Sequence, residues 1–312
     1  MSEKGLRVLT YNIHKGFNAG NRRFVLHQIR EALVAADADL MFLQEMQGEH
    51  HRHQQRIADW PLLSHLEFLA ENNWPFHAYG KNAIYNAGHH GNAILSKHPF
   101  ERWENINVSP FPWASRSLLH GVIRLPRMAA ETVPDSLRHS HPPWRPEVSQ
   151  SVGNRCDRLP RMATSTAPDR RRHFRSEASV GNRFDRPPEN TQELHIVCIH
   201  FGLIGKERRL QISKLSDHID NHVPYDAPLI IAGDFNDWLG QADRLFHDRL
   251  CLQEVFHVTH GRYARSFPSW LPFLPMDRIY YRGLTPVSCE RLAHAPWHAL
   301  SDHAPLTASF SL

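Results

Sequence analysis

The sequence predicts an α/β fold in which amphipathic helices cover the outer faces of β-sheets. The main observation is an alternation: short apolar segments typical of buried strands are separated by segments whose apolar residues recur at helical spacing. The second is composition, since 312 residues with 41% apolar and 22% charged side chains are typical of a globular protein. Collagen-like, coiled-coil and fully disordered chains are thereby excluded.

The predicted elements follow one another along the whole chain. Strands are expected where β-branched, aromatic or other large apolar residues cluster, at 6–11, 40–43, 93–95, 118–125, 194–199, 228–232, 278–281 and 304–310. Helices are expected at 23–36, 65–71 and 206–223. The first helix places Leu26, Ile29, Leu33 and Ala36 on one face. The last carries Leu210, Leu215 and Ile219 at helical spacing.

A segment rich in proline and arginine, residues 126–192, interrupts this alternation. It contains a duplication, because residues 125–129 recur at 159–163 and residues 151–158 recur, with one substitution, at 179–186. Two copies poor in apolar residues cannot form a solenoid. We therefore predict one domain over 1–312, in which 126–192 is a disordered insertion at the turn between strands 118–125 and 194–199. An arm that binds nucleic acid or anionic lipid is the less favoured alternative.

The basic charge of the protein is confined to this insertion. Residues 126–192 hold 12 arginines against 8 acidic residues, which equals the whole formal charge of +4. The other 245 residues are therefore neutral, and bulk charge says little about their substrate.

The sequence also gives expectations about compartment and partners. No signal-peptide segment and no run of about 18 apolar residues is present, and the four cysteines lack zinc-like spacing. We expect Cys198, within a strand, to be buried and reduced. The expectation is a cytoplasmic monomer with no transmembrane segment and no obligate protein partner.

Polar residues recur where the predicted strands end or begin. They are Asn12, Glu45, His200, Asp234, Asn236, Asp277, Asp302 and His303. Taken singly, each is common as a turn former or a helix cap. Their repetition at strand ends instead predicts that they converge on one edge of the sheets.

The chemical types of these residues point to phosphate-ester hydrolysis. Asn12, Glu45, Asp234 and Asp302 offer hard oxygen donors, which suit Mg²⁺ or Mn²⁺ better than zinc. His200 and His303 can transfer protons near neutral pH. A divalent metal with histidines and carboxylates supplies the charge neutralisation and activated water that such hydrolysis needs. No nucleophile elbow, phosphate-binding loop or dinucleotide motif competes.

Six motifs, taken in order, resemble the endonuclease/exonuclease/phosphatase (DNase I-like) superfamily, and within it a small bacterial branch. They lie at residues 10–16, 43–45, 200, 233–236, 276–280 and 301–303. The resemblance implies a four-layer α/β sandwich of two mixed sheets packed face to face with helices outside. It further implies a Mg²⁺ site held by Glu45 and Asn12, with Asp302 in or near the coordination shell.

The resemblance also implies the catalytic roles. Asp234 would align or deprotonate the attacking water, Asn236 would bind phosphoryl oxygens, and His303, held by Asp277, would stabilise the transition state or transfer a proton. His200 would donate a hydrogen bond or proton to the phosphate. The division of acid and base roles between the two histidines stays open.

Three further features leave alternatives open. His90 or Asn92 would contact phosphate by resemblance, although a hairpin turn around Gly88 and Gly91 is equally expected. Arg209 could reach the substrate, but a solvated helical face is the favoured interpretation. The aromatic segment 267–275 could stack on a base or touch lipid acyl chains, although covering the core is favoured.

The predicted function is a Mg²⁺-dependent phosphodiesterase, nuclease-like, that acts by in-line attack of water on nucleic acid or a phospholipid headgroup. One enzyme alternative is a phospholipid or sphingomyelin-type phosphodiesterase, and another is a phosphomonoesterase. A third alternative is a catalytically silent scaffold that binds a partner through the arginine-rich insertion.

Overall fold

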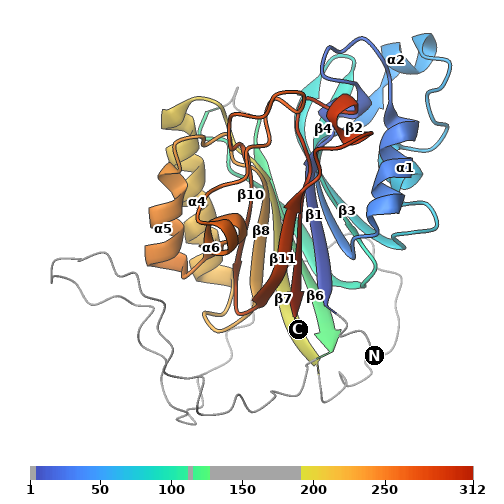
Figure 1. Cartoon of the computed structure of the whole chain (residues 1–312). Coiled ribbons are helices and arrows are strands. Elements are labelled where there is room, and N and C mark those ends of the chain that lie inside the picture. The colour runs from blue at the N-terminus through green and yellow to red at the C-terminus, as the bar shows by residue number, and fades with distance from the viewer. Residues whose placement is uncertain (1–4, 112–114, 127–190, 312) are drawn as a thin grey trace, which may run out of the picture.

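The computed structural model describes residues 5–111, 115–126 and 191–311. Two six-stranded mixed sheets pack face to face, in the strand orders β11-β12-β1-β2-β4-β3 and β5-β6-β7-β8-β10-β9. Helices α4, α5 and α6 lie on one side of this pair, and α1 and α2 lie on the other (Figure 1). The predicted four-layer α/β sandwich is therefore confirmed.

The elements have the following bounds. The strands are β1 Leu6–Asn12, β2 Leu40–His50, β3 Phe76–Tyr85, β4 Gly88–Ser96, β5 Phe100–Asn107, β6 Ser117–Pro126, β7 Thr191–His200, β8 Leu229–Asp234, β9 Gln253–Glu254, β10 Asp277–Arg282, β11 Thr285–Arg291 and β12 Leu306–Ser311. The helices are α1 Leu26–Ala36, α2 His51–Arg56, α3 His65–Ala70, α4 Gly205–His222, α5 Gln241–Leu250 and α6 Val255–His260, with the 3₁₀ turns η1 His14–Gly16 and η4 Trp297–Ala299.

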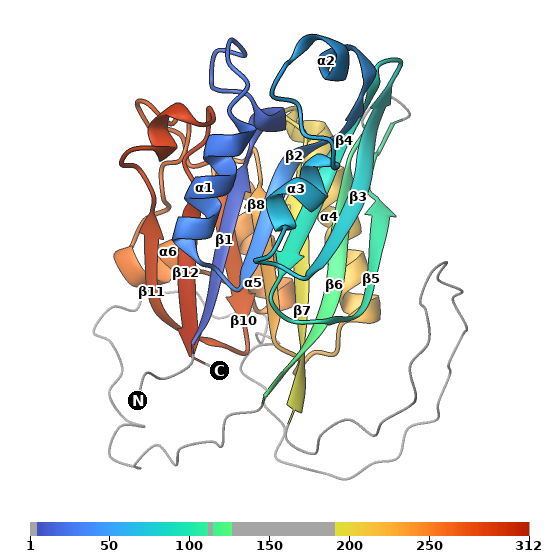
Figure 2. The same ribbon diagram turned by 90° about the vertical axis from the view of Figure 1, so that its right-hand side faces the viewer.

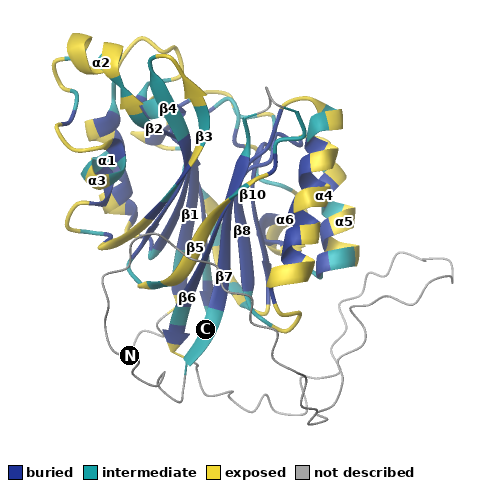
Figure 3. Ribbon diagram, turned by 180° about the vertical axis from the view of Figure 1, so that it is seen from behind, coloured by how far each residue is buried: buried dark blue, intermediate teal, exposed yellow. Residues whose placement is uncertain are grey.

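Three apolar clusters hold the layers together. The central one fills the space between the sheets and includes Phe42, Ile196 and Ile279. A second joins the first sheet to α1 and α3, and a third joins the second sheet to α4 and α5. Figure 2 shows α1 and α3 against the first sheet, and Figure 3 shows burial along the strands and exposure on the outer faces of the helices.

The predicted strands are present, and the four strands that the sequence did not indicate share one property. β3, β5, β9 and β11 are the edge strands of the two sheets. An edge strand buries little surface and needs no apolar run, so it gives a weak sequence signal. β5, for example, is exposed along most of its length.

The strands that flank the insertion pair as predicted. β6 and β7 are antiparallel, and their register runs to the pair Pro126 and Thr191. The predicted disorder of the insertion lies outside the described residues. Cys198 is buried and free, as expected. Among the described helices, none is long and apolar enough to cross a membrane.

Candidate active site

Three neighbouring strands place a histidine and two aspartates in one row. Asp234 ends β8, and the sheet register sets it opposite His200 of β7 on one side and Asp277 of β10 on the other. The Nε2 atom of His200 lies 3.5 Å from Oδ2 of Asp234. Gly233 permits this close strand packing, since its φ is 152° and a Cβ atom there would lie 2.0 Å from the carbonyl oxygen of Ile199.

His303 closes the row from the loop before β12. Its Nδ1 atom lies 2.7 Å from Oδ2 of Asp277, and its Nε2 atom lies 3.7 Å from Oδ2 of Asp234. Burial by itself would lower the pKa of His303, but the two carboxylates outweigh it and raise the pKa to about 10. His303 is therefore an imidazolium near neutral pH.

Asp234 is a buried carboxylate at the centre of the site. It accepts hydrogen bonds from Nδ2 of Asn12, at 3.2 Å, and from the backbone N–H of Asn236, at 3.0 Å. Burial raises its pKa, and the charge of His303 counteracts this in part. The Asn12 bond also joins the two sheets, since Asn12 ends β1 of the first sheet and Asp234 belongs to the second. The side chain of Asn236 donates to the carbonyl of Phe201.

His200 has the opposite charge state from His303. Burial lowers its pKa well below the usual value, and the nearby charge of Arg116 lowers it further. The ring is therefore neutral near neutral pH.

Glu45 stands on the first sheet in an unusual backbone conformation. Its φ is 53°, at a register shift of β2 between Leu43 and Met46. Such left-handed conformations of non-glycine residues cost free energy and cluster at functional sites. Oε2 of Glu45 accepts a 2.6 Å hydrogen bond from Nζ of Lys15. Burial would raise the pKa of Glu45, but its interactions with His200 and Lys15 bring the pKa to about 2, so the carboxylate is ionised.

The other two predicted metal ligands lie beside His14. The backbone N–H of His14 donates to Oδ1 of Asn12 at 3.1 Å, and its Nδ1 atom lies 3.7 Å from Oδ1 of Asp302. That ring nitrogen is buried and has no hydrogen-bond partner among the described residues. Asn12 and Asp302 thus both contact the turn η1, which follows β1 and also carries Lys15.

The predicted substrate-binding residues differ in their surroundings. The predicted hairpin turn is present at residues 86–87, directly before Gly88, and joins β3 to β4. Gly91, His90 and Asn92 lie within β4 and not in the turn. Asn92 is buried and donates to the carbonyl of Ser117 at 3.0 Å. Burial, followed by the charge of Lys15, lowers the pKa of His90 to about 4, so this ring is neutral near neutral pH.

Arg209 is not brought to the site by any contact in the described part of the chain. It is exposed on α4, as the favoured interpretation expected, whereas its neighbour Arg208 is buried and donates to the carbonyl of Leu203. The guanidinium of Arg208 also lies 3.7 Å from Asp237. Arg208 therefore has a structural role under the segment that follows β7.

Arg116 is a site residue that sequence reasoning missed. Its charge lowers the pKa of both His200 and His90, and its buried Nε atom has no hydrogen-bond partner among the described residues. The predicted pairing of the two strands could have indicated Arg116. In an antiparallel pair of β6 with β7, the start of β6 lies beside the end of β7. Lys15 is a second such residue, although it lies inside the first motif.

The aromatic segment 267–275 borders the site and remains partly open to solvent. Phe267 lies 4.9 Å, between ring centroids, from His303, and the backbone N–H of Ser269 donates to the carbonyl of Asp302. The prediction that this segment covers the core is wrong for its tip, since Trp270, Leu271 and Phe273 are more than half exposed, at 67%, 59% and 56%.

Comparisons with known proteins identify the relatives of this chain. Residues 9–303 match the Endonuclease/Exonuclease/phosphatase family. The chain is 34% identical to YbhP of Escherichia coli strain K12 over 306 residues, covering 98% of this chain and 96% of that protein.

The fold is shared with solved structures at low identity. An endonuclease/exonuclease/phosphatase from Beutenbergia cavernae has a TM-score of 0.61 and 15% identity, covering 99% of this chain and 72% of that one. TDP2 of D. rerio, complexed with a single strand DNA product, has a TM-score of 0.54 and 13% identity, covering 99% and 100%.

Proposed function

The chain belongs to the Endonuclease/Exonuclease/phosphatase family, and from this premise we propose that it is a Mg²⁺- or Mn²⁺-dependent phosphodiesterase of nuclease type. The substrate would be a phosphodiester, cleaved at a P–O bond by in-line attack of water. The single-stranded DNA product in the D. rerio TDP2 structure supports a nucleic-acid substrate for this fold.

The observation that carries this proposal is the buried carboxylate of Asp234 between two histidines of opposite charge state. His200 is neutral because burial lowers its pKa, and His303 is charged because Asp277 and Asp234 hold its proton. Titratable groups whose environments separate their pKa values are typical of acid and base catalysis. A buried row of this kind is weak evidence for a purely structural role, since burying charges costs free energy that their pairing only offsets.

The donor set fits a divalent cation that prefers oxygen ligands. Glu45 is fully ionised, Asn12 offers an amide oxygen and Asp302 a second carboxylate. We assign His303 to proton transfer rather than to metal binding, because Asp277 and Asp234 raise the pKa of its ring to about 10. When bound, Mg²⁺ would neutralise phosphate charge and polarise the P–O bonds.

The residues of the chain itself perform the remaining steps. Asp234 in its ionised form accepts a hydrogen bond from the attacking water and aligns it with phosphorus. His303 donates from Nε2 to the charge that develops in the transition state, and Asp277, which accepts from Nδ1, keeps the ring charged. Arg116 and His200 bind phosphoryl oxygens from the β6–β7 side, and Lys15 and His90 do so from the first sheet.

A direct test compares substrates and metals on the purified full-length protein. We expect hydrolysis of bis-p-nitrophenyl phosphate, and of single-stranded or plasmid DNA or RNA, only with Mg²⁺ or Mn²⁺, and strong loss of activity in Glu45→Ala. Faster hydrolysis of p-nitrophenyl phosphate than of the diester would favour the phosphomonoesterase alternative. Activity that survives chelation would refute the metal mechanism.

The exposed tip of the aromatic segment favours a second candidate, a phosphodiesterase that acts on phospholipid headgroups. Trp270, Leu271 and Phe273 present apolar surface next to Asp302 and His303, where it could enter the headgroup region of a membrane. The assay is hydrolysis of phospholipid vesicles. A Trp270→Ala/Phe273→Ala double variant would lose vesicle hydrolysis but keep activity on bis-p-nitrophenyl phosphate if lipid is the substrate.

A further inference from the structure

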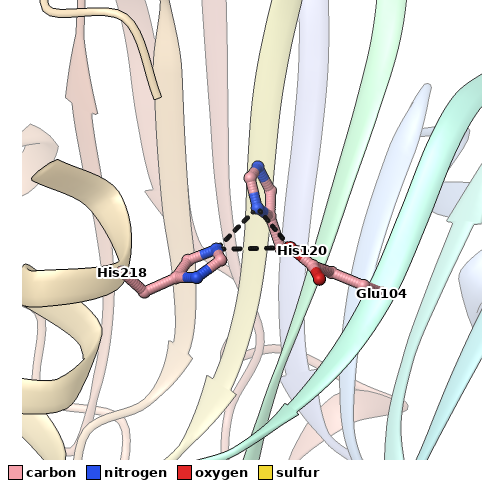
Figure 4. A group of neighbouring side chains, drawn as sticks. All are labelled: Glu104, His120 and His218. Atoms are coloured by element: carbon pink, nitrogen blue, oxygen red, sulfur yellow. Dashed lines mark hydrogen bonds and ion pairs between the residues drawn. The ribbon is translucent and has the colours of Figure 1, made fainter. Parts of the chain in front are cut away.

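A cluster of histidines lies on the outer face of the second sheet, beneath α4 and away from the candidate active site. Glu104 of β5 stands directly opposite His120 of β6 in the strand register, and His218 comes from α4 above them. Figure 4 shows the three side chains pointing toward one another. His195 of β7 lies behind His120 and stands five residues before His200, or about 16 Å along an extended strand. This cluster is therefore separate from the catalytic row.

The three ligand atoms surround a single point at metal-binding distance. Nδ1 of His120 lies 2.9 Å from Nε2 of His218, and Oε1 of Glu104 lies 3.8 Å and 3.6 Å from these two nitrogens. A circle through the three atoms has a radius of about 2.0 Å, which matches Zn–N and Zn–O bonds of about 2.0–2.2 Å. A metal ion at that point would need only small movements of the side chains.

The three side chains offer ligand atoms of the types that Zn²⁺ accepts. Each histidine supplies a ring nitrogen, and Glu104 supplies a carboxylate oxygen.

A second layer of contacts orients the ligand ring of His120. Its Nε2 atom lies 3.0 Å from Nδ1 of His195. If His120 donates from Nε2 to His195, the lone pair on its Nδ1 faces the central point. Metal-ligating histidines usually pass their other N–H to such a neighbour. The remaining Nε2 atom of His195 is buried without a partner among the described residues. Within the described part of the chain, the ring of His195 therefore hydrogen-bonds to His120 alone.

We propose that Glu104, His120 and His218 form a binding site for one Zn²⁺ ion that fastens β5 and β6 to α4. Two imidazoles and one carboxylate favour Zn²⁺ over the Mg²⁺ expected at the strand ends. The ion enters from the side of Glu104, whose side chain is 55% exposed, and a water molecule completes the tetrahedral shell. The ion would hold the C-terminal part of α4, which carries His218, against the second sheet.

The experiment uses the full-length protein, stripped of metal with a chelator and titrated with Co²⁺ as a spectroscopic substitute for Zn²⁺. We expect one equivalent to give the strong visible absorption of four-coordinate Co²⁺, and Zn²⁺ to displace it. Glu104→Gln and His218→Gln should each weaken Zn²⁺ binding at least about tenfold, measured by competition with a chromogenic indicator. Zn²⁺ at 100 times its Kd should raise the Tm of the unmodified protein by about 5 °C.

Two controls separate this site from the catalytic one. Glu101→Gln changes a neighbouring glutamate of β5 that pairs with Arg124, and it should leave Co²⁺ absorption unchanged. Glu45→Ala should lose phosphodiesterase activity but keep the absorption. Circular dichroism of the metal-free variants checks that they are folded. Absorption that persists in folded His218→Gln, or that disappears only in Glu45→Ala, would overturn the zinc site.

Discussion

The two halves of the candidate active site differ in how they are built. On the second sheet, Asp234 and Asp277 are almost fully buried, with side-chain exposures of 2% and 1%, and they hold His303 through direct ion pairs. On the first sheet, the side chains of Glu45 and Lys15 are 19% and 33% exposed. The buried half is set by sheet register, whereas the open half depends on a left-handed residue in β2 and a single lysine contact.

This difference indicates that the two halves have different roles, one in the chemical step and the other in binding. A buried row held by direct ion pairs can keep a proton in place and hold pKa values apart. A more open set of oxygen donors can exchange a counterion, such as Lys15, for a metal ion and a phosphate. Substitutions in the buried half should therefore change the chemical step, and those in the open half should change binding.

The largest effect is expected for Asp234→Asn. The amide keeps the shape but cannot accept a proton from water, so kcat/KM for bis-p-nitrophenyl phosphate should fall by about 10⁴-fold, at the upper end for loss of a general base. Steady-state kinetics measure it, with Asp248→Asn, an exposed aspartate paired with Arg244, as the matched control. If the variant kept more than a tenth of the activity, the proposal that Asp234 acts on the attacking water would be refuted.

Asp277→Asn should rank second and should carry a pH signature. The pKa of His303 is raised from 6.5 to about 10 in the folded protein. The protonated ring therefore stabilises the folded state fully below pH 6.5, and this contribution is lost as pH rises through 10. The variant should lose about 3–5 kcal/mol in the free energy of unfolding at pH 6, and this deficit should shrink toward pH 10. Urea unfolding across this range measures it.

The same variant should also lower kcat by about 10³-fold near neutral pH, because His303 loses its proton more easily. A deficit in stability that does not change between pH 6 and pH 10 would contradict a charged His303.

Glu45→Gln should affect metal use more than chemistry. The neutral amide is a weaker ligand, so the Mg²⁺ concentration for half-maximal activity should rise about 10- to 100-fold, with recovery of much of kcat at saturating Mg²⁺. Metal titration of the hydrolysis rate tests this. Glu49→Gln, an exposed glutamate of the same strand, is the control, and an equal metal requirement in both variants would place the metal elsewhere.

The smallest effect is expected for Arg116→Gln. Loss of one charged hydrogen bond to phosphate should raise KM about tenfold with little change in kcat. Arg209→Gln, which alters the exposed arginine of α4, should leave both constants unchanged. If Arg209→Gln raised KM and Arg116→Gln did not, the assignment of phosphate binding to the β6 side would be reversed.

The sequence predicted the central strands and the residues that end them, because buried strands need continuous apolar runs and strand ends expose polar side chains. The strand pattern alone therefore places His200, Asp234 and Asp277 at one edge. Edge strands such as β5 and β11 escaped prediction because exposed strands carry no such pattern. Arg116 escaped because it precedes its strand, and only the pairing of β6 with β7 sets it beside His200.

The sequence by itself determined the fold class, the paired strands on either side of the insertion and the types of residue at the site. Only the tertiary structure decided which histidine is charged, since that depends on His303 lying 2.7 Å from Asp277 while His200 is buried beside Arg116. The cluster of Glu104, His120 and His218 likewise joins two strands and a helix that are far apart in the chain. Local patterns specify secondary structure, whereas pKa values and ligand geometry depend on distances that only folding sets.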